Sequence, residues 1–139
     1  MRRSFLLTLL FASVAYAASP DVRDAYVPQP PPGQTMAVMF LTIHNPLAQT
    51  VSLMSASSEL AARVELHTHV HTHGQMKMQA LTKVELPAGR DTTFKPGGLH
   101  LMLFGLKRAL QAGDSVPVSL ALSDGSQLRA IAAVRDLRQ

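Results

Sequence analysis

Cysteine is absent from the 139-residue sequence, and tryptophan is absent as well. Without cysteine the chain can form neither a disulfide framework nor a thiol redox centre, and no metal site can use thiolate ligands. Methionine, which occurs seven times, is then the only side chain that offers a soft sulfur donor. Its thioether also keeps that donor in an oxidising compartment, where paired thiols form disulfides.

Long hydrophobic segments are also missing. The apolar run at residues 5–14 follows Arg2 and Arg3 and ends in an Ala-Tyr-Ala pattern. It is shorter than the roughly 20 residues that a membrane-spanning helix needs, and its features are typical of a signal peptide with a small-residue cleavage site. We therefore predict a signal peptide over residues 1–17, followed by one exported domain over residues 18–139 that is not embedded in a membrane.

The chain has little excess of charge of either sign. It contains 13 basic and 9 acidic residues, and 11 basic ones remain when Arg2 and Arg3 are set aside. The basic residues are scattered singly, and aromatic residues make up only 5% of the chain. A nucleic-acid-binding surface needs clustered cations, often interleaved with aromatic rings, so the sequence excludes a nucleic-acid partner.

Short apolar or alternating segments recur along the chain and are separated by turn residues. The proline-rich segment at 27–33 predicts an extended or turning lead-in, and glycines beside short polar residues mark later reversals. No segment shows a convincing helical period. The pattern predicts an all-β domain, an antiparallel β-sandwich or Greek-key barrel. The expected strands cover residues 35–43, 51–56, 61–70, 76–81, 83–86, 91–95, 99–104, 116–122 and 127–134.

Histidine and methionine donors occur in pairs on three of these strands. Residues two apart in a strand share a face, and the pairs are His67 with His69, Met76 with Met78, and His100 with Met102. The leucines that alternate with the last pair would point into the core. Three neighbouring segments can therefore each present nitrogen or sulfur donors to one place.

A hairpin through Gly74 would return Met78 beside His67, and His100 with Met102 would complete a ring of four donors. Two imidazoles and two thioethers form a neutral, soft set that suits Cu(I), whereas Zn(II) seldom accepts a thioether. The set favours binding and transport of Cu(I) without redox chemistry. Because an acceptor's ligands must reach the ion, we expect His67 and Met102 to be partly exposed.

The spacing of these residues resembles that of the PCu(A)C-type periplasmic copper chaperones. Their motif is a histidine, ten residues, a methionine, twenty-one residues and then His-x-Met, and His67, Met78, His100 and Met102 stand at those intervals. Residues 42–46, 74–78, 95–103 and 105–107 are also similar to the family. The resemblance implies a cupredoxin-like β-sandwich in the periplasm. It also implies delivery of Cu(I) to the copper centre of cytochrome c oxidase, with a Sco-type thiol protein as a partner.

The chain departs from the family pattern by further histidines between the first two motif ligands. Imidazole suits both Cu(II) and Zn(II), so these residues, with Met76 beside them, predict either an auxiliary metal site or a solvated polar loop. The additional residues are His69, His71 and His73. Two other functions stay open: a periplasmic metal buffer without a recipient, and a zinc hydrolase or lyase.

The zinc enzyme would use His67, His69 and His100 as ligands and leave an open position for water. Such chemistry usually needs a general acid or base near the metal, and Glu65 is the only acidic residue close to the histidines. The remaining candidates are expected to be structural. We predict that Met36, Met39 and Met54 pack in the core and that His44 makes an ordinary hydrogen bond at a strand end.

Overall fold

A computed structural model describes residues 8–13 and 18–138, which form ten strands and no helix. The strands are β1 (Asp21–Pro28), β2 (Met36–His44), β3 (Val51–Ser57), β4 (Ala61–Thr72), β5 (Gln75–Leu81), β6 (Val84–Leu86), β7 (Asp91–Thr93), β8 (His100–Leu106), β9 (Ser115–Leu122) and β10 (Gln127–Arg135). The all-β prediction is confirmed. In the described ranges, no helix is long and apolar enough to cross a membrane. Most of the predicted signal peptide, residues 1–7 and 14–17, lies outside the described residues.

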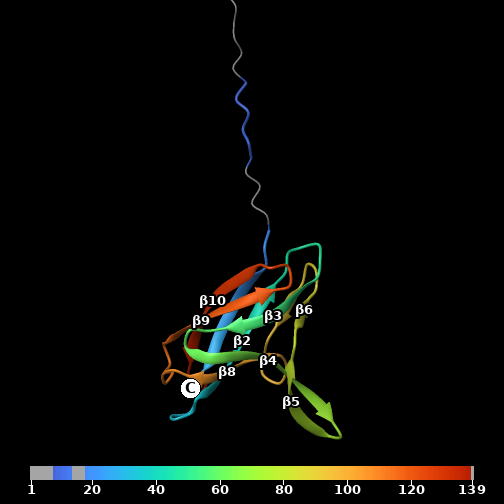
Figure 1. The fold of residues 1–139 in the computed structure, drawn as a ribbon. Helices are drawn as coiled ribbons and strands as arrows, with labels where there is room; N and C mark the ends of the chain where they lie inside the picture. The colour runs from blue at the N-terminus through green and yellow to red at the C-terminus, as the bar shows by residue number, and fades with distance from the viewer. Residues whose placement is uncertain (1–7, 14–17, 139) are drawn as a thin grey trace, which may run out of the picture.

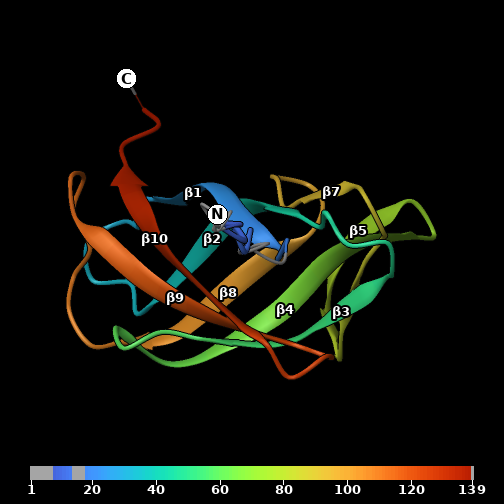
Figure 2. The ribbon, with the colours of Figure 1, turned by 90° about the horizontal axis from the view of Figure 1, so that it is seen from above.

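Seven of the strands in the described part of the chain close into a barrel (Figures 1 and 2). Their order is β4, β8, β2, β1, β10, β9 and β3, and the pair Ala56 with Val64 joins β3 back to β4. Three further strands attach to this ring: β5 pairs with β4, β6 with β3 and β7 with β2. Neighbouring strands run antiparallel except β1 and β10, which run parallel. The ring leaves its member strands without an open edge.

Each of the nine strands expected from the sequence overlaps one of the ten strands observed, but β1 has no counterpart among the expected ones. Its first half pairs with β2, and the register then shifts between Arg23 and Tyr26. Asp24 lies there with a φ of 53°, which is the backbone of a β-bulge. The lead-in expected at 27–33 begins inside this strand and turns at Pro32–Gly33.

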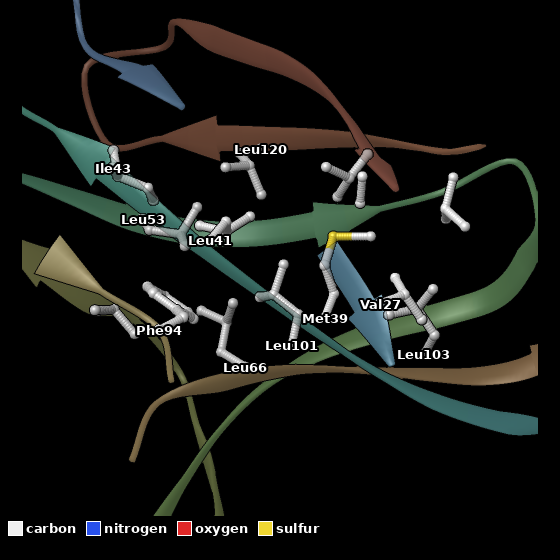
Figure 3. Close-up of a cluster of buried hydrophobic side chains, with 14 of the residues drawn as sticks. Val27, Met39, Leu41, Ile43, Leu53, Leu66, Phe94, Leu101, Leu103 and Leu120 are labelled. Carbon is white, nitrogen blue, oxygen red and sulfur yellow. The ribbon is translucent and has the colours of Figure 1, made fainter. Parts of the chain in front are cut away.

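The interior of the barrel is filled by aliphatic side chains, together with the thioether of Met39 and the ring of Phe94 (Figure 3). Members of this core are Val27, Met39, Leu41, Ile43, Leu53, Leu66, Phe94, Leu101, Leu103 and Leu120. Each large apolar side chain that is buried in this way contributes about 1.5–3 kcal/mol. The prediction that Met39 packs in the core is confirmed. For Met36 and Met54 it is wrong, because both are 45% exposed on strand faces that point away from the interior.

The β4–β5 hairpin projects beyond the barrel, and both views show it extending from the body (Figures 1 and 2). Thr72 pairs with Gln75, so only His73 and Gly74 form the turn. Both have positive φ, 51° and 72°, which matches the twist of a two-residue hairpin. The predicted reversal through Gly74 is confirmed. Because β5 has β4 as its only pairing partner among the described strands, this hairpin is supported from one side only.

Candidate metal centre

Three of the four predicted ligands lie on the paired strands β4 and β8: His67 on β4, and His100 and Met102 on β8. His67 lies directly opposite His100, and Glu65 lies opposite Met102. Because residues paired across antiparallel strands share a face, all four side chains lie on the outer face of the sheet. The prediction that His100 and Met102 point together, away from the leucines of β8, agrees with this register: Leu101 and Leu103 are both in the core.

Met78 approaches from the other side of β4. The register of the hairpin places Met78 directly opposite His69, while His67 lies opposite Ala80. The sequence led us to expect Met78 beside His67, and the structure instead makes it a diagonal neighbour on the same face. Diagonal neighbours in a sheet are still within reach of long side chains. A flexible thioether therefore remains able to turn towards His67.

The prediction that His67 and Met102 are partly exposed is wrong. His67 is 9% exposed, Met102 is 7% exposed and His100 is 2% exposed. The His67 ring is flanked by the rings of His100 and Phe104, with centroids 5.7 Å and 6.1 Å away, and Met102 lines a groove of ≈ 230 Å³ together with Pro30 and Pro31. The local strand pattern predicts none of these neighbours, because they come from other segments of the chain. Met78, in contrast, is 49% exposed.

His100 is held in a single tautomer by the turn that precedes β8. Its Nδ1–H donates to the carbonyl oxygen of Gly98 at 3.0 Å, and because a carbonyl only accepts, Nε2 must have the free lone pair. That Nε2 is buried and has no hydrogen-bond partner within the described residues. Burial lowers the pKa of His100, against the opposing effect of the Gly98 bond. The ring is therefore neutral, as a metal ligand must be.

His67 is oriented in the same manner by a carboxylate. Its Nε2 lies 2.8 Å from Glu65 Oε2, and Arg63 Nε donates to the other carboxylate oxygen at 3.1 Å. These bonds, that to His67 first, lower the pKa of Glu65, so the carboxylate accepts and His67 Nε2–H donates. In the neutral ring that a metal ligand requires, the lone pair then lies on His67 Nδ1, and this atom too is buried without a partner in the described part of the chain. Arg63 also stacks over Phe104, 4.2 Å from the ring centroid.

Two buried lone pairs without partners are unusual, because an unsatisfied buried polar atom costs about 1–3 kcal/mol. The centroids of the His67 and His100 rings are 5.7 Å apart, a separation that metal–nitrogen bonds of about 2 Å on each side can span. A hydrogen-bonded second nitrogen that fixes the tautomer is typical of histidines that bind metal. With the thioethers of Met102 and Met78 nearby, the donor set is neutral and fits a soft monovalent cation.

The sequence did not assign Glu65, Arg63 or Gly98 to this centre. Glu65 was considered only as an acid or base of a zinc enzyme, although its position two residues before His67 already placed it on the same face. Gly98 stands two residues before His100 in the same way. Such spacing was the available signal, but only the structure shows that these partners bind the nitrogen that would not contact a metal.

The extra histidines have different positions. His69 lies with its ring centroid 5.0 Å from that of His100, and His71 lies opposite Met76, whereas His73 lies in the hairpin turn. In the described residues, no group of three His, Cys, Asp or Glu side chains is arranged to hold a metal. The three-histidine zinc site therefore gains no support. A larger hollow of ≈ 530 Å³ lies between β3, β9 and β10 and includes none of these donors.

Comparison with known proteins identifies relatives of most of the chain. The LpqE-like family model, a lipoprotein family, matches residues 21–134. A protein of Leifsonia xyli subsp. xyli named "Putative lipoprotein Lxx21020" is 36% identical over 105 residues, which make up 75% of this chain and 63% of the relative. The chain thus spans less than two thirds of that relative's length.

Solved structures share the fold. The apo PCuAC domain from PmoF1 has a TM-score of 0.72 at 20% identity and covers 88% of this chain and 98% of the domain. The solution structure of Cu(I)-DR1885 from Deinococcus radiodurans has a TM-score of 0.64 at 29% identity and covers 93% of this chain and 85% of that one. These comparisons confirm the cupredoxin-like fold and the resemblance to PCu(A)C-type proteins that the motif predicted.

Proposed function

The chain belongs to the LpqE-like family, and from that premise we propose that it is a copper chaperone of the PCu(A)C type. It binds one Cu(I) ion tightly as cargo and passes it on without catalysing a reaction. The proposed ligands are His67, Met78, His100 and Met102. Cu(I) binding by DR1885, which has the same fold and 29% identity, supports the choice of metal.

The observation that supports this proposal most strongly is the pair of buried, partnerless nitrogens, His67 Nδ1 and His100 Nε2. Each belongs to a ring whose other nitrogen is already engaged, so each is free to donate its lone pair to a metal. Thioether ligands select Cu(I) over Zn(II), which prefers thiolate, imidazole or carboxylate. Four neutral donors leave the charge of the ion uncompensated, which favours the monovalent state.

A Cu(I) titration against a competing chelator under anaerobic conditions tests the ligand set. Met78→Leu and Met102→Leu keep the apolar volume but remove the sulfur, so each is expected to weaken the tight Cu(I) equivalent sharply. Met54→Leu is the matched control, because Met54 is 45% exposed on β3, outside the centre. Wild-type affinity in both ligand variants would refute the assignment.

Delivery is the second part of the proposal. The protein would act in the periplasm and supply the copper centre of cytochrome c oxidase, in cooperation with a Sco-type thiol protein. The family resemblance supports this role, and the predicted signal peptide over residues 1–17 supports the compartment. A metal buffer would bind Cu(I) equally well but would have no recipient.

Transfer distinguishes the chaperone from the buffer. The Cu(I)-loaded protein is mixed with an apo oxidase copper domain, with and without a reduced Sco-type protein, and the metal content of each is measured after separation. Movement of copper at a rate faster than that from a chelator of equal affinity is expected for a chaperone. Retention of the copper in every mixture would leave only the buffer.

A further inference from the structure

The β4–β5 hairpin includes the most accessible of the four proposed ligands. Three of the four proposed ligands are less than one tenth exposed, and Met78 alone, at 49%, is open to solvent. A transferred ion must exchange ligands stepwise with the donor or the acceptor, so exchange has to begin where a ligand is accessible. That place is the β4–β5 hairpin, to which Met78 belongs.

Every histidine and methionine in the two strands of this hairpin lies on the same face. His71 pairs directly with Met76, and His69 pairs directly with Met78. Since paired residues and residues two apart share a face, these side chains continue the face that holds His67. The opposite face of the hairpin has threonine, valine, glutamine and lysine residues and no such donor.

The donors become more exposed towards the tip. His69 is half-buried, while His71 is exposed and Met76 is 52% exposed. In the part of the chain that the structure describes, neither imidazole makes a side-chain hydrogen bond. His69 also connects the two regions, because it lies opposite Met78 and its ring centroid is 5.0 Å from that of His100.

We propose that His69, His71 and Met76 form a second, exposed Cu(I) site, the hairpin site, through which copper enters and leaves the buried centre. This inference rests on the proposed function, because an entry site requires a centre to supply. The thioether of Met76, directly opposite His71 and diagonal to His69, favours Cu(I) over Cu(II) or Zn(II), which the histidines alone would accept. His73 is not included, since its positive φ of 51° places it in the turn.

Movement between the two sites needs no change of oxidation state. The hairpin site and the buried centre both offer neutral nitrogen and sulfur donors, so one ligand can replace another while the ion stays monovalent. His69 and Met78 lie between the two positions and can bind the ion during the exchange. The hairpin site has fewer buried donors than the centre and is therefore the weaker of the two.

The double variant His71→Ala/Met76→Leu tests the hairpin site in the full chain. Anaerobic Cu(I) titration of the wild type should show one tight and one weaker equivalent. The double variant should lose the weaker equivalent, retain the tight one with unchanged affinity, and release copper to a chelator more slowly. The matched control is His44→Gln/Met54→Leu, which also replaces one histidine and one exposed methionine, but outside the hairpin. His44 there bonds to Asp91 at 2.6 Å. This control should bind and release copper as the wild type does.

The outcomes separate this inference from the proposed function. If the wild type binds one tight Cu(I), and the double substitution changes neither stoichiometry nor release rate, the hairpin site is refuted and the buried centre stands. If the wild type binds no Cu(I), both fall. If the weaker equivalent takes Cu(II) or Zn(II) but no Cu(I), the Cu(I) assignment is overturned. X-ray absorption that shows a sulfur ligand on the weakly bound copper of the wild type, and no such ligand in Met76→Leu, would support the hairpin site.

Discussion

Replacing Glu65 by alanine tests whether a neighbour holds His67 ready as a ligand. The bond from His67 Nε2–H to Glu65 Oε2, 2.8 Å long, is the ring's only hydrogen bond to the described residues. It selects the tautomer in which Nδ1 has the lone pair. In Glu65→Ala both tautomers become accessible and the ring is free to rotate, so fewer molecules present Nδ1 to the metal.

The size of the effect follows from what remains in place. Removal of a partner that orients a metal-binding histidine typically lowers metal affinity by about 10–100-fold. Phe104 continues to pack near the His67 ring, with centroids 6.1 Å apart, so we expect the lower end, an increase in the Kd for Cu(I) of about tenfold. Glu65→Gln should lose less, because an amide oxygen can still accept the bond.

The assay is competition for Cu(I) with a chromophoric chelator in the absence of oxygen. Glu85→Ala is the matched control, since Glu85 is an exposed carboxylate on β6, away from the centre, and it should bind as the wild type does. Wild-type affinity in Glu65→Ala, alongside weak binding in His67→Ala, would refute the reasoning. An equal loss in Glu65→Gln and Glu65→Ala would show that charge matters and orientation does not.

Two further predictions concern stability and are measured as the free energy of unfolding in urea. Gly105→Ala places a Cβ 2.8 Å from that of Ala62 at a φ of +64°, and should cost about 1–2 kcal/mol for the backbone and about 1–3 kcal/mol for the clash. Gly125→Ala, at +86° in open space, should show only the backbone cost, and equal losses would contradict the clash. Asn45→Ala removes a fully buried amide that donates to three backbone carbonyls and accepts from one backbone N–H. It should cost about 1–3 kcal/mol, whereas the exposed Gln49→Ala should cost under about 0.5 kcal/mol, and a negligible loss in Asn45→Ala would count against a structural role for that amide.

Local alternation was sufficient to locate most of the fold. Strands such as β4 and β9 follow a period of two that the sequence displays directly. β1 does not, because the bulge at Asp24 interrupts the alternation, and its parallel partner β10 lies near the other end of the chain. Closure of the ring depends on pairings between distant strands, such as β3 with β4, which no local pattern specifies.

In the candidate centre, too, the features set by local sequence were predicted and those set by contacts between strands were not. The period of two correctly placed His100 and Met102 on one face, and the Gly74 turn was correctly identified. The position of Met78 depends on the turn containing only two residues, which sets it opposite His69. The burial of His67 depends on the neighbouring rings of His100 and Phe104 on β8, so its exposure was misjudged. Whether these four side chains bind Cu(I) stays a prediction.

The hairpin's place outside the closed ring has a dynamic consequence. Local opening of a protein costs least where few neighbours must separate, and β5 can detach from β4 while every pairing within the ring is kept. Amide hydrogens of β5 should therefore exchange with solvent before those of β2 or β9. An incoming protein that displaces the Met78 thioether would then need to open only the β4–β5 hairpin, while the barrel keeps its structure.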